Sequence, residues 1–361
     1  MARPTCRHGR HNAAFCIVPP YIHHSIAEHG NAAQRAAALQ TLAADQTFRA
    51  FRMAQPPRPA QSVGRRARPG LLEVKVRRTI YDAHHSQSLP GTIVRSEGGP
   101  AVADPAANEA YDGLGATFDF YQDVFERNSI DDEGMPLDAV VHFGQGYDNA
   151  FWDGQEMVFG DGHIFNRFTA SLDVIGHELT HGVTEDEAHL IYAYQSGALN
   201  ESMSDVFGVM IAQWKAQQNT AAATWLIGAE LFAGTKLKGQ ALRSMKAPGT
   251  AFNDPVLGKD PQPAHMKDYV KTFQDEGGVH INSGIPNHAF YLVATRLGGY
   301  SWDKAGRIWY ETLRDSRIRP NTGFASFARR TVANARALYG ATSTEAKTVI
   351  KSWGDVGITV V

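Results

Sequence analysis

Apolar residues recur with a helical period over much of the chain. The stretch that follows Asp104 repeats at three- and four-residue spacing, which predicts a helix to about Arg127. Asp104 and Pro105 suit its start, as an N-cap acid and a proline at the first position. The same period predicts further helices at residues 31–52, 171–184, 197–214, 282–297, 302–314, 323–339 and 344–353.

Strand signals gather in the first half of the chain. Short apolar or alternating runs bounded by turn residues predict strands at 71–76, 78–82, 139–143, 149–152 and 155–159. We therefore expect an α+β fold of two lobes: a strand-rich lobe at 71–184 and a helical lobe at 185–361. The predicted helix at 171–184 lies at their seam, where ligand sites are common.

The first 70 residues differ from the body that follows. Residues 55–70 are rich in Pro, Arg and Ala, which is typical of a linker. Residues 1–78 hold 13 Lys/Arg and 3 Asp/Glu, whereas the remainder holds 22 and 34. A basic leader on an acidic body either docks on that body or binds nucleic acid or membrane. The arginines are scattered rather than clustered, so we favour docking and no nucleic-acid partner.

Composition narrows the class of protein. Of 361 residues, 43% are hydrophobic and 20% charged, which indicates a soluble globular protein, and we expect a monomer. The sequence shows no 18-residue apolar run and no secretory apolar segment, so it predicts no membrane span and residence in the cytoplasm on synthesis, with export by a route without a signal peptide left open. The two cysteines, Cys6 and Cys16, rule out a disulfide scaffold. With His8 and His11 between them, their spacing fits no common zinc module.

The most informative motif is His177-Glu178-x-x-His181 within an apolar run. On a helix, residues four apart share a face, so both imidazoles can reach one point. Glu178 can lean over the same point without binding it. This arrangement is typical of a zinc ion with a general base beside its bound water.

A hydrolytic zinc needs a third protein ligand and one open position. Glu201 and Asp205 lie four residues apart on the next predicted helix, so both carboxylates can face the zinc helix. They could also be exposed or form salt bridges. Because two carboxylates on an apolar helix are costly to bury unpaired, we favour Glu201 as the ligand and Asp205 as the partner of a ligand imidazole.

With Glu201 twenty residues after His181, the body resembles the thermolysin-like neutral zinc metalloprotease family over about residues 79–361. Four further segments carry the resemblance: residues 149–152, Tyr192, 242–245 and 275–284. The leader, with Pro19-Pro20-Tyr21-Ile22 and no signal peptide, resembles the propeptide of the protealysin-like branch, which is later removed. The resemblance implies a Zn²⁺-dependent endopeptidase.

The resemblance also implies a role for each site residue. His177, His181 and Glu201 bind the metal, with Asn200 and Asp205 next to the ligands. Glu178 is the general base, His280 and Tyr192 stabilise the oxyanion, and Asp275 orients His280. The groups that hold the peptide are Asn149, Ala150, Trp152 and Arg243. One pocket receives the side chain of the substrate residue that follows the scissile bond, and its walls are Phe165, Phe168, Val174, Ile227, Leu231 and Leu242. All six are apolar, which favours a bulky hydrophobic residue at that position. Each of them could instead be ordinary core.

Together these features predict a metalloendopeptidase acting on peptides or proteins and made as a self-processing zymogen. We expect its leader to block the cleft and to be cut between about residues 51 and 78. One alternative is a catalytically silent relative that acts as a peptide-binding module. It would need a damaged base or metal ligand, and all four of these residues are intact.

The family's paired calcium site near the zinc is predicted to be absent. Asp173 matches one of its ligands. Four positions that should carry its other acids hold Ala212, Thr224, Leu226 and Ala229. Because calcium takes six to eight oxygen ligands, a lone carboxylate cannot hold two ions. We expect apolar packing and local hydrogen bonds there instead, with Leu226 turned inward.

Overall fold

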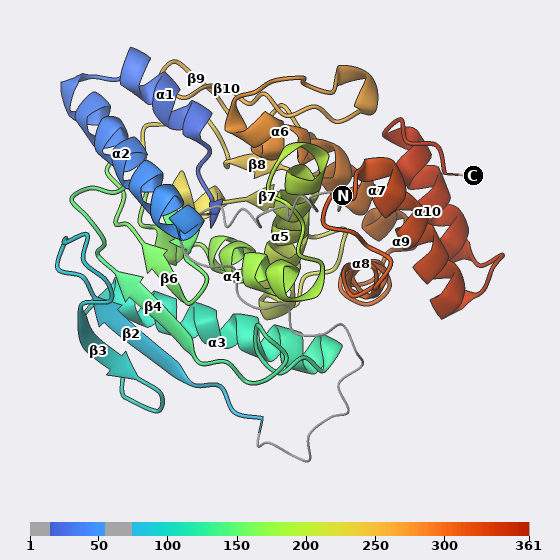
Figure 1. Cartoon of the computed structure of the whole chain (residues 1–361), viewed down its shortest axis with the longest axis horizontal. Coiled ribbons are helices and arrows are strands. Elements are labelled where there is room, and N and C mark those ends of the chain that lie inside the picture. The colour runs from blue at the N-terminus through green and yellow to red at the C-terminus, as the bar shows by residue number, and fades with distance from the viewer. Residues whose placement is uncertain (1–14, 55–73, 361) are drawn as a thin grey trace, which may run out of the picture.

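The computed structural model describes residues 15–54 and 74–360 (Figure 1). Its main sheet has the order β1-β5-β6-β4-β2-β3. The strands are β1 (Phe15–Cys16), β2 (Arg78–Asp82), β3 (Thr92–Ser96), β4 (Leu137–Val141), β5 (Ala150–Trp152) and β6 (Glu156–Phe159). Strand β4 runs parallel to β2 and β6, whereas the other pairings are antiparallel. The leader therefore supplies one edge strand of the body's sheet.

Helix α3 (Pro105–Phe125) packs on this sheet with the predicted apolar face. The Asp104 carboxylate accepts hydrogen bonds from the backbone N–H groups of Ala106 and Ala107, which confirms it as the N-cap. The helix ends before the predicted limit because Glu126 takes a left-handed conformation (φ 57°). Arg127 is instead buried and forms ion pairs with Asp186 and Glu187.

Helices α4 (Leu172–Glu187) and α5 (Tyr194–Lys215) pack against each other between the two lobes. Two glycines allow this close approach. A Cβ atom on Gly208 would lie 2.4 Å from the Asp173 carbonyl oxygen, and one on Gly176 would lie 3.2 Å from the Gly208 Cα. Any larger residue would push the helices apart. The glycines thus bring the side chains of the two helices within reach of one another.

The second lobe is helical, as predicted. Its helices are α6 (Asp275–Asn282), α7 (Gly284–Leu297), α8 (Ala305–Leu313), α9 (Phe324–Tyr339) and α10 (Thr344–Asp355). Between α5 and α6 the chain forms short strands and 3₁₀ turns: β7 (Leu226–Ile227), η2 (Ala229–Leu231), β8 (Arg243–Ser244), β9 (Asn253–Asp254), β10 (Gly258–Lys259) and η3 (Met266–Asp268). A further 3₁₀ turn, η1 (Phe168–Ala170), precedes α4. Within residues 15–54 and 74–360, no helix has both the length and the apolar character needed to cross a bilayer.

The described part of the leader forms two helices that lie on the body. Helix α1 (Pro20–His29) begins at the Pro-Pro segment and is anchored by Ser25, whose hydroxyl donates to the Val256 carbonyl (2.9 Å). Helix α2 (Ala32–Ala54) contacts the turn before β5, where the Asp148 amide donates to the Thr41 hydroxyl (3.1 Å). The phenyl ring of Phe48 contacts Phe143 and Phe151.

One local prediction was wrong, and two elements were missed. Residues 74–76 are not in a strand, and 71–73 lie outside the described residues. Strand β3 was missed because its residues lie at a sheet edge, where Thr92 and Arg95 keep the run from alternating clearly. Helix α1 was also missed; it begins at the Pro-Pro segment, where Pro20 occupies the first turn of the helix.

A charged cluster joins the start of α3 to the sheet. His142 follows β4, and its two ring nitrogens contact the carboxylates of Asp104 (2.9 Å) and Asp161 (2.7 Å). The hydrogen bond to Asp161 raises the pKa of His142 to about 9, against the effect of partial burial and with the help of Asp104. The folded-state pKa therefore exceeds the unfolded value of about 6.5.

We predict that His142 stabilises the fold fully below about pH 6.5, and that this contribution disappears as the pH rises through about 9. His142→Gln should cost roughly 1 kcal/mol at pH 6, after discounting for solvent screening, and almost nothing at pH 10. Thermal melts at both pH values measure this. His84→Gln is the control, because that side chain is 65% exposed and pairs with the carboxylate of Asp82. An equal loss at both pH values would contradict the assignment.

Candidate active site

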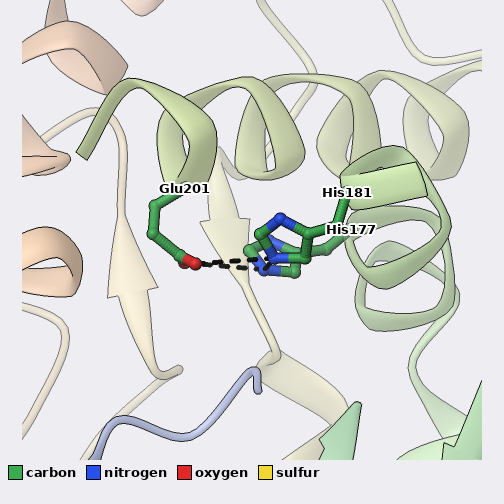
Figure 2. Close-up of side chains that lie close together, drawn as sticks. All are labelled: His177, His181 and Glu201. Atoms are coloured by element: carbon green, nitrogen blue, oxygen red, sulfur yellow. Dashed lines mark hydrogen bonds and ion pairs between the residues drawn. The ribbon is translucent and has the colours of Figure 1, made fainter. Parts of the chain in front are cut away.

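Three buried side chains from α4 and α5 meet at one point (Figure 2). The Nε2 atoms of His177 and His181 lie 3.1 Å apart, and the Glu201 carboxylate oxygens lie 3.6 and 3.5 Å from them. Ligand atoms about 2.0–2.2 Å from a tetrahedral zinc would be separated by roughly 3.3–3.6 Å. Oε2 of Glu201 is buried without a hydrogen-bond partner, as expected of an atom that binds a metal. The residues therefore fit zinc.

Outer hydrogen bonds orient both imidazoles. The Nδ1 of His177 donates to Asp205 (2.8 Å), and the Nδ1 of His181 lies 2.7 Å from the Asn200 Oδ1. This leaves each Nε2 lone pair facing the metal position. Ser204, whose hydroxyl lies 3.0 Å from the same Nδ1, was not predicted. Its spacing of four from Asn200 is the signal that could have identified it.

Asp205 links a metal ligand to the arginine predicted to bind substrate. Its carboxylate also accepts from Arg243 Nε (2.9 Å) and Nη2 (2.8 Å), and from Asn287 (2.8 Å). Burial alone would raise the pKa of Asp205, but the Arg243 charge and the His177 hydrogen bond bring it well below its usual range. The carboxylate therefore stays ionised and compensates the buried guanidinium.

Glu178 follows His177 on α4 and is fully buried, but it is not one of the three clustered residues. Its Oε2 accepts from the backbone amide of Trp152 (3.1 Å), whereas its buried Oε1 has no hydrogen-bond partner. Burial, together with the charge of Glu201, raises the pKa of Glu178 well above its ordinary value. A carboxylate of raised pKa with one free oxygen suits a general base.

His280 lies beside the ligands, with its Nε2 3.5 Å from Oε2 of Glu201. Its Nδ1 and its backbone amide bond the two oxygens of Asp275 (2.5 and 2.9 Å), and its Nε2 lies 3.1 Å from the Tyr192 hydroxyl. Burial lowers the pKa of His280, but the charges of Glu201 and Asp275 raise it overall. Tyr192 also donates to Glu201. The arrangement provides two hydrogen-bond donors near the metal position.

The Asp-Glu-Gly-Gly segment makes the bond between His280 and Asp275 possible. All four residues from 275 to 278 have positive φ, between 48° and 88°. A Cβ atom on Gly277 would lie 2.4 Å from the Tyr194 ring, so only glycine fits there. Gln262, whose side chain donates to the His280 carbonyl (2.7 Å), was not predicted. It stands between two prolines and gives no sequence signal.

The predicted substrate edge carries the leader. Strand β1 pairs with β5 in the register Cys16 to Phe151, and the Ile17 amide donates to the Ala150 carbonyl (3.2 Å). The Asn149 side chain accepts a hydrogen bond from the amide of Val18, the next leader residue. Arg243 Nη1 donates to the Ile17 carbonyl (3.0 Å). Three of the four predicted peptide-binding groups, Asn149, Ala150 and Arg243, therefore hold a peptide segment of this same chain, and the fourth, Trp152, pairs with Phe15 of that segment.

The six predicted wall residues are all buried. Leu231 and Leu242 lie on either side of Gly228, where a Cβ atom would lie 3.2 Å from each side chain. The rings of Phe165 and Phe168 are 6.2 Å apart, and η1 contacts η2. Val174 lies on α4, and Ile227 on β7. Ile17 of the leader is buried too.

The region around Asp173 is built from protein hydrogen bonds. Its carboxylate accepts from the Ser171 hydroxyl (2.6 Å) and from the amides of Val174 (2.9 Å) and Gly228 (2.8 Å). The expectation that Leu226 turns inward was wrong, because its side chain is half-buried. Side chains alternate along the short strand β7, so Ile227 faces the core instead.

Both lobes match domains of a known protein family. Residues 31–185 match the catalytic domain of thermolysin metallopeptidases, and residues 188–358 match their alpha-helical domain. An extracellular metalloprotease of Pectobacterium carotovorum is 53% identical over 95% of this chain and 96% of its own length. Thermolysin of Bacillus caldolyticus is 38% identical over 77% of this chain and 50% of its own length.

A solved structure resembles the whole described chain. The precursor of protealysin, a metalloproteinase from Serratia proteamaculans, aligns with a TM-score of 0.85 and 50% identity, over 96% of this chain and 100% of its own. The cytoplasmic expectation was wrong, since the Pectobacterium relative and a 42% identical one from Serratia marcescens are named as extracellular.

Proposed function

This chain belongs to the thermolysin family of metallopeptidases, in its protealysin-like branch, and is a zinc endopeptidase; from that premise we propose that it cuts before bulky hydrophobic residues and is made as a self-processing zymogen. The convergence of His177, His181 and Glu201 beside the free oxygen of Glu178 is the observation that supports the chemistry. A silent binding module has no support, because base and ligands are intact and oriented.

Each step follows from the position of a side chain. When zinc is bound, it lowers the pKa of water and polarises the scissile carbonyl. Glu178 takes a proton from the attacking water through its free Oε1 and returns it to the leaving nitrogen. His280, held by Asp275, and the hydroxyl of Tyr192 donate to the oxygen that becomes negative. Arg243 holds the carbonyl of the substrate residue that follows the scissile bond.

The preference for a bulky hydrophobic residue after the cut rests on the six apolar wall residues. None of them carries a polar group that could compensate a charged substrate side chain in a buried site. Each methylene of the substrate that such a pocket accommodates is worth about 1–3 kcal/mol in discrimination. We therefore expect the kcat/KM for peptides with Leu or Phe after the cut to exceed that for Asp by several orders of magnitude.

The zymogen proposal rests on competition for one sheet edge. A peptide substrate that adds a strand to β5 needs the hydrogen-bonding groups of Ala150 and Asn149. In the intact chain these groups bond Ile17 and Val18 of the leader. Substrate and leader therefore exclude each other. The expected cleavage region, residues 51–78, lies mostly outside the described residues, as do Cys6, His8 and His11.

The test is casein hydrolysis by the purified full chain, followed over time with and without a zinc chelator. We expect activity to appear as the leader is removed, to vanish with the chelator and to return with added zinc. Activity that resists complete removal of zinc would contradict the metal assignment. Full activity of a chain that still carries its leader would contradict the zymogen.

We also expect no paired calcium site beside α4. The Asp173 oxygens already accept hydrogen bonds from Ser171, Val174 and Gly228. A ligand at 100 times its dissociation constant would add about 2.7 kcal/mol to the unfolding free energy. Thermal melts of the Glu178→Gln protein with millimolar calcium and with a calcium chelator should therefore nearly coincide. A shift of many degrees with calcium bound at Asp173 would show that the site exists.

A further inference from the structure

We propose that the leader is bound as a substrate with the Cys16–Ile17 peptide bond at the catalytic position, and that this bond is itself cut during maturation. The proposal rests on the proposed function and names one bond of this chain as a substrate of its own site. The inhibitory segment would then be destroyed at that bond rather than released whole.

The leader strand runs in the direction that places its two sides on the matching sides of the site. Strand β1 runs antiparallel to β5, with Cys16 opposite Phe151, and the chain continues toward Asn149. Trp152, at the other end of β5, donates to Glu178. The N-terminal side of the leader thus lies toward the base, and its C-terminal side toward the groups that hold the peptide after the cut.

The register of the leader strand against the site locates the scissile peptide bond. The Cys16 carbonyl oxygen lies 3.1 Å from His280 Nε2, the donor assigned to the scissile carbonyl. The next carbonyl, that of Ile17, accepts from Arg243 (3.0 Å). The amide nitrogen between these two carbonyls donates to Ala150 (3.2 Å). The peptide bond between the oxyanion donor and Arg243 is therefore Cys16–Ile17.

The residues after the bond are held over a longer span. The Val18 amide donates to Asn149 Oδ1 (2.9 Å), and the Asn149 side-chain amide donates back to the Val18 carbonyl (3.2 Å). The same amide also bonds Asp45 of α2 (3.1 Å), which ties the bound strand to the leader's second helix. Ile17 is fully buried and supplies the bulky apolar side chain that we expect after a cut.

The reaction at this bond is ordinary amide hydrolysis. Water adds its oxygen to the Cys16 carbonyl carbon, the C–N bond to Ile17 breaks, and Glu178 carries the water proton to the Ile17 nitrogen. While α1 and α2 stay docked, the new amine remains beside the new carboxyl group, so the bond can re-form. Cleavage becomes irreversible once the linker is cut and the helices leave.

The experiment follows the fragments of the wild-type full chain with zinc. Samples quenched with EDTA at intervals are assigned by intact mass and N-terminal sequencing. We expect one fragment that begins at Ile17 and a complementary one that ends at Cys16. Leader fragments that still span this bond after maturation is complete would overturn the proposal. Casein hydrolysis in the same samples separates this outcome from failure of the proposed function, in which casein would also stay intact.

Two matched variants test the register. Ile17→Ala trims the side chain assigned to the pocket after the cut, and it should slow cleavage at this bond roughly 10- to 200-fold. Val18→Ala trims the neighbouring buried residue and keeps every backbone hydrogen bond, so it should slow cleavage much less. Equal slowing by both variants would show that only loosened docking was measured, and would overturn the assignment of Ile17.

Discussion

The Glu178→Gln protein is expected to bind zinc normally and to lose peptidase activity by about 10²- to 10⁴-fold. The amide keeps the size of the carboxylate, and its oxygen can still accept from the Trp152 amide (3.1 Å). It cannot take a proton from water. His177, His181 and Glu201 remain as ligands, so metal content should not change. Zinc analysis and casein hydrolysis on the same sample measure the two properties separately.

This variant also tests self-processing. Because its leader still occupies the β5 edge and its base is missing, it should stay full length when expressed alone. Wild-type enzyme added in trans should mature it, which shows that the linker can be cut. Activity within about tenfold of wild type would remove Glu178 from the role of base. Normal maturation of this variant without added protease would refute only the self-processing proposal.

The Asp205→Ala protein is expected to be strongly destabilised. The carboxylate is fully buried and bonds His177, Arg243 and Asn287. Its removal leaves the Arg243 guanidinium buried without a counter-charge, a defect that costs about 3–5 kcal/mol. Loss of the bond to His177 should weaken zinc binding about 10- to 100-fold. Urea unfolding and zinc titration measure the two effects.

A surface ion pair is the matched control. Asp355 pairs with Arg296, and their side chains are 35% and 31% exposed. Asp355→Ala should therefore cost at most about 1 kcal/mol and leave zinc affinity unchanged. If Asp205→Ala costs no more than this control, the charge compensation that we assign to Asp205 is wrong. Asp205→Asn should retain part of the stability, because the amide oxygen still accepts one of the hydrogen bonds.

Features set by spacing along one helix could be predicted from the sequence. The pairs His177 with His181 and Glu201 with Asp205 are four residues apart, so helix geometry alone puts each pair on one face. The resemblance to a family supplied His280, Arg243 and the wall residues, and the structure brings His280 and Arg243 to the site. Whether they act as assigned remains a prediction.

Contacts between distant segments could not be predicted. The bond between the Cys16 carbonyl and His280 joins residues 264 apart in sequence, and the pairing of the leader with β5 depends on how two helices dock. The role of Gln262 likewise depends on the path of a loop between prolines. Leu226 failed for a simpler reason: the period of a short strand decides its direction, and the strand itself was not predicted.

The pairing of β1 with β5 also determines what the sheet exposes after maturation. On the proposed removal of the leader, β5 would become an outer strand with unpaired backbone donors and acceptors, a surface that in many proteins invites aggregation. Here that strand is three residues long, and Arg243 and Asn149 flank it with polar groups that recognise a single backbone. In the described structure the leader covers this edge, and a strand of three residues is too short to template a growing sheet.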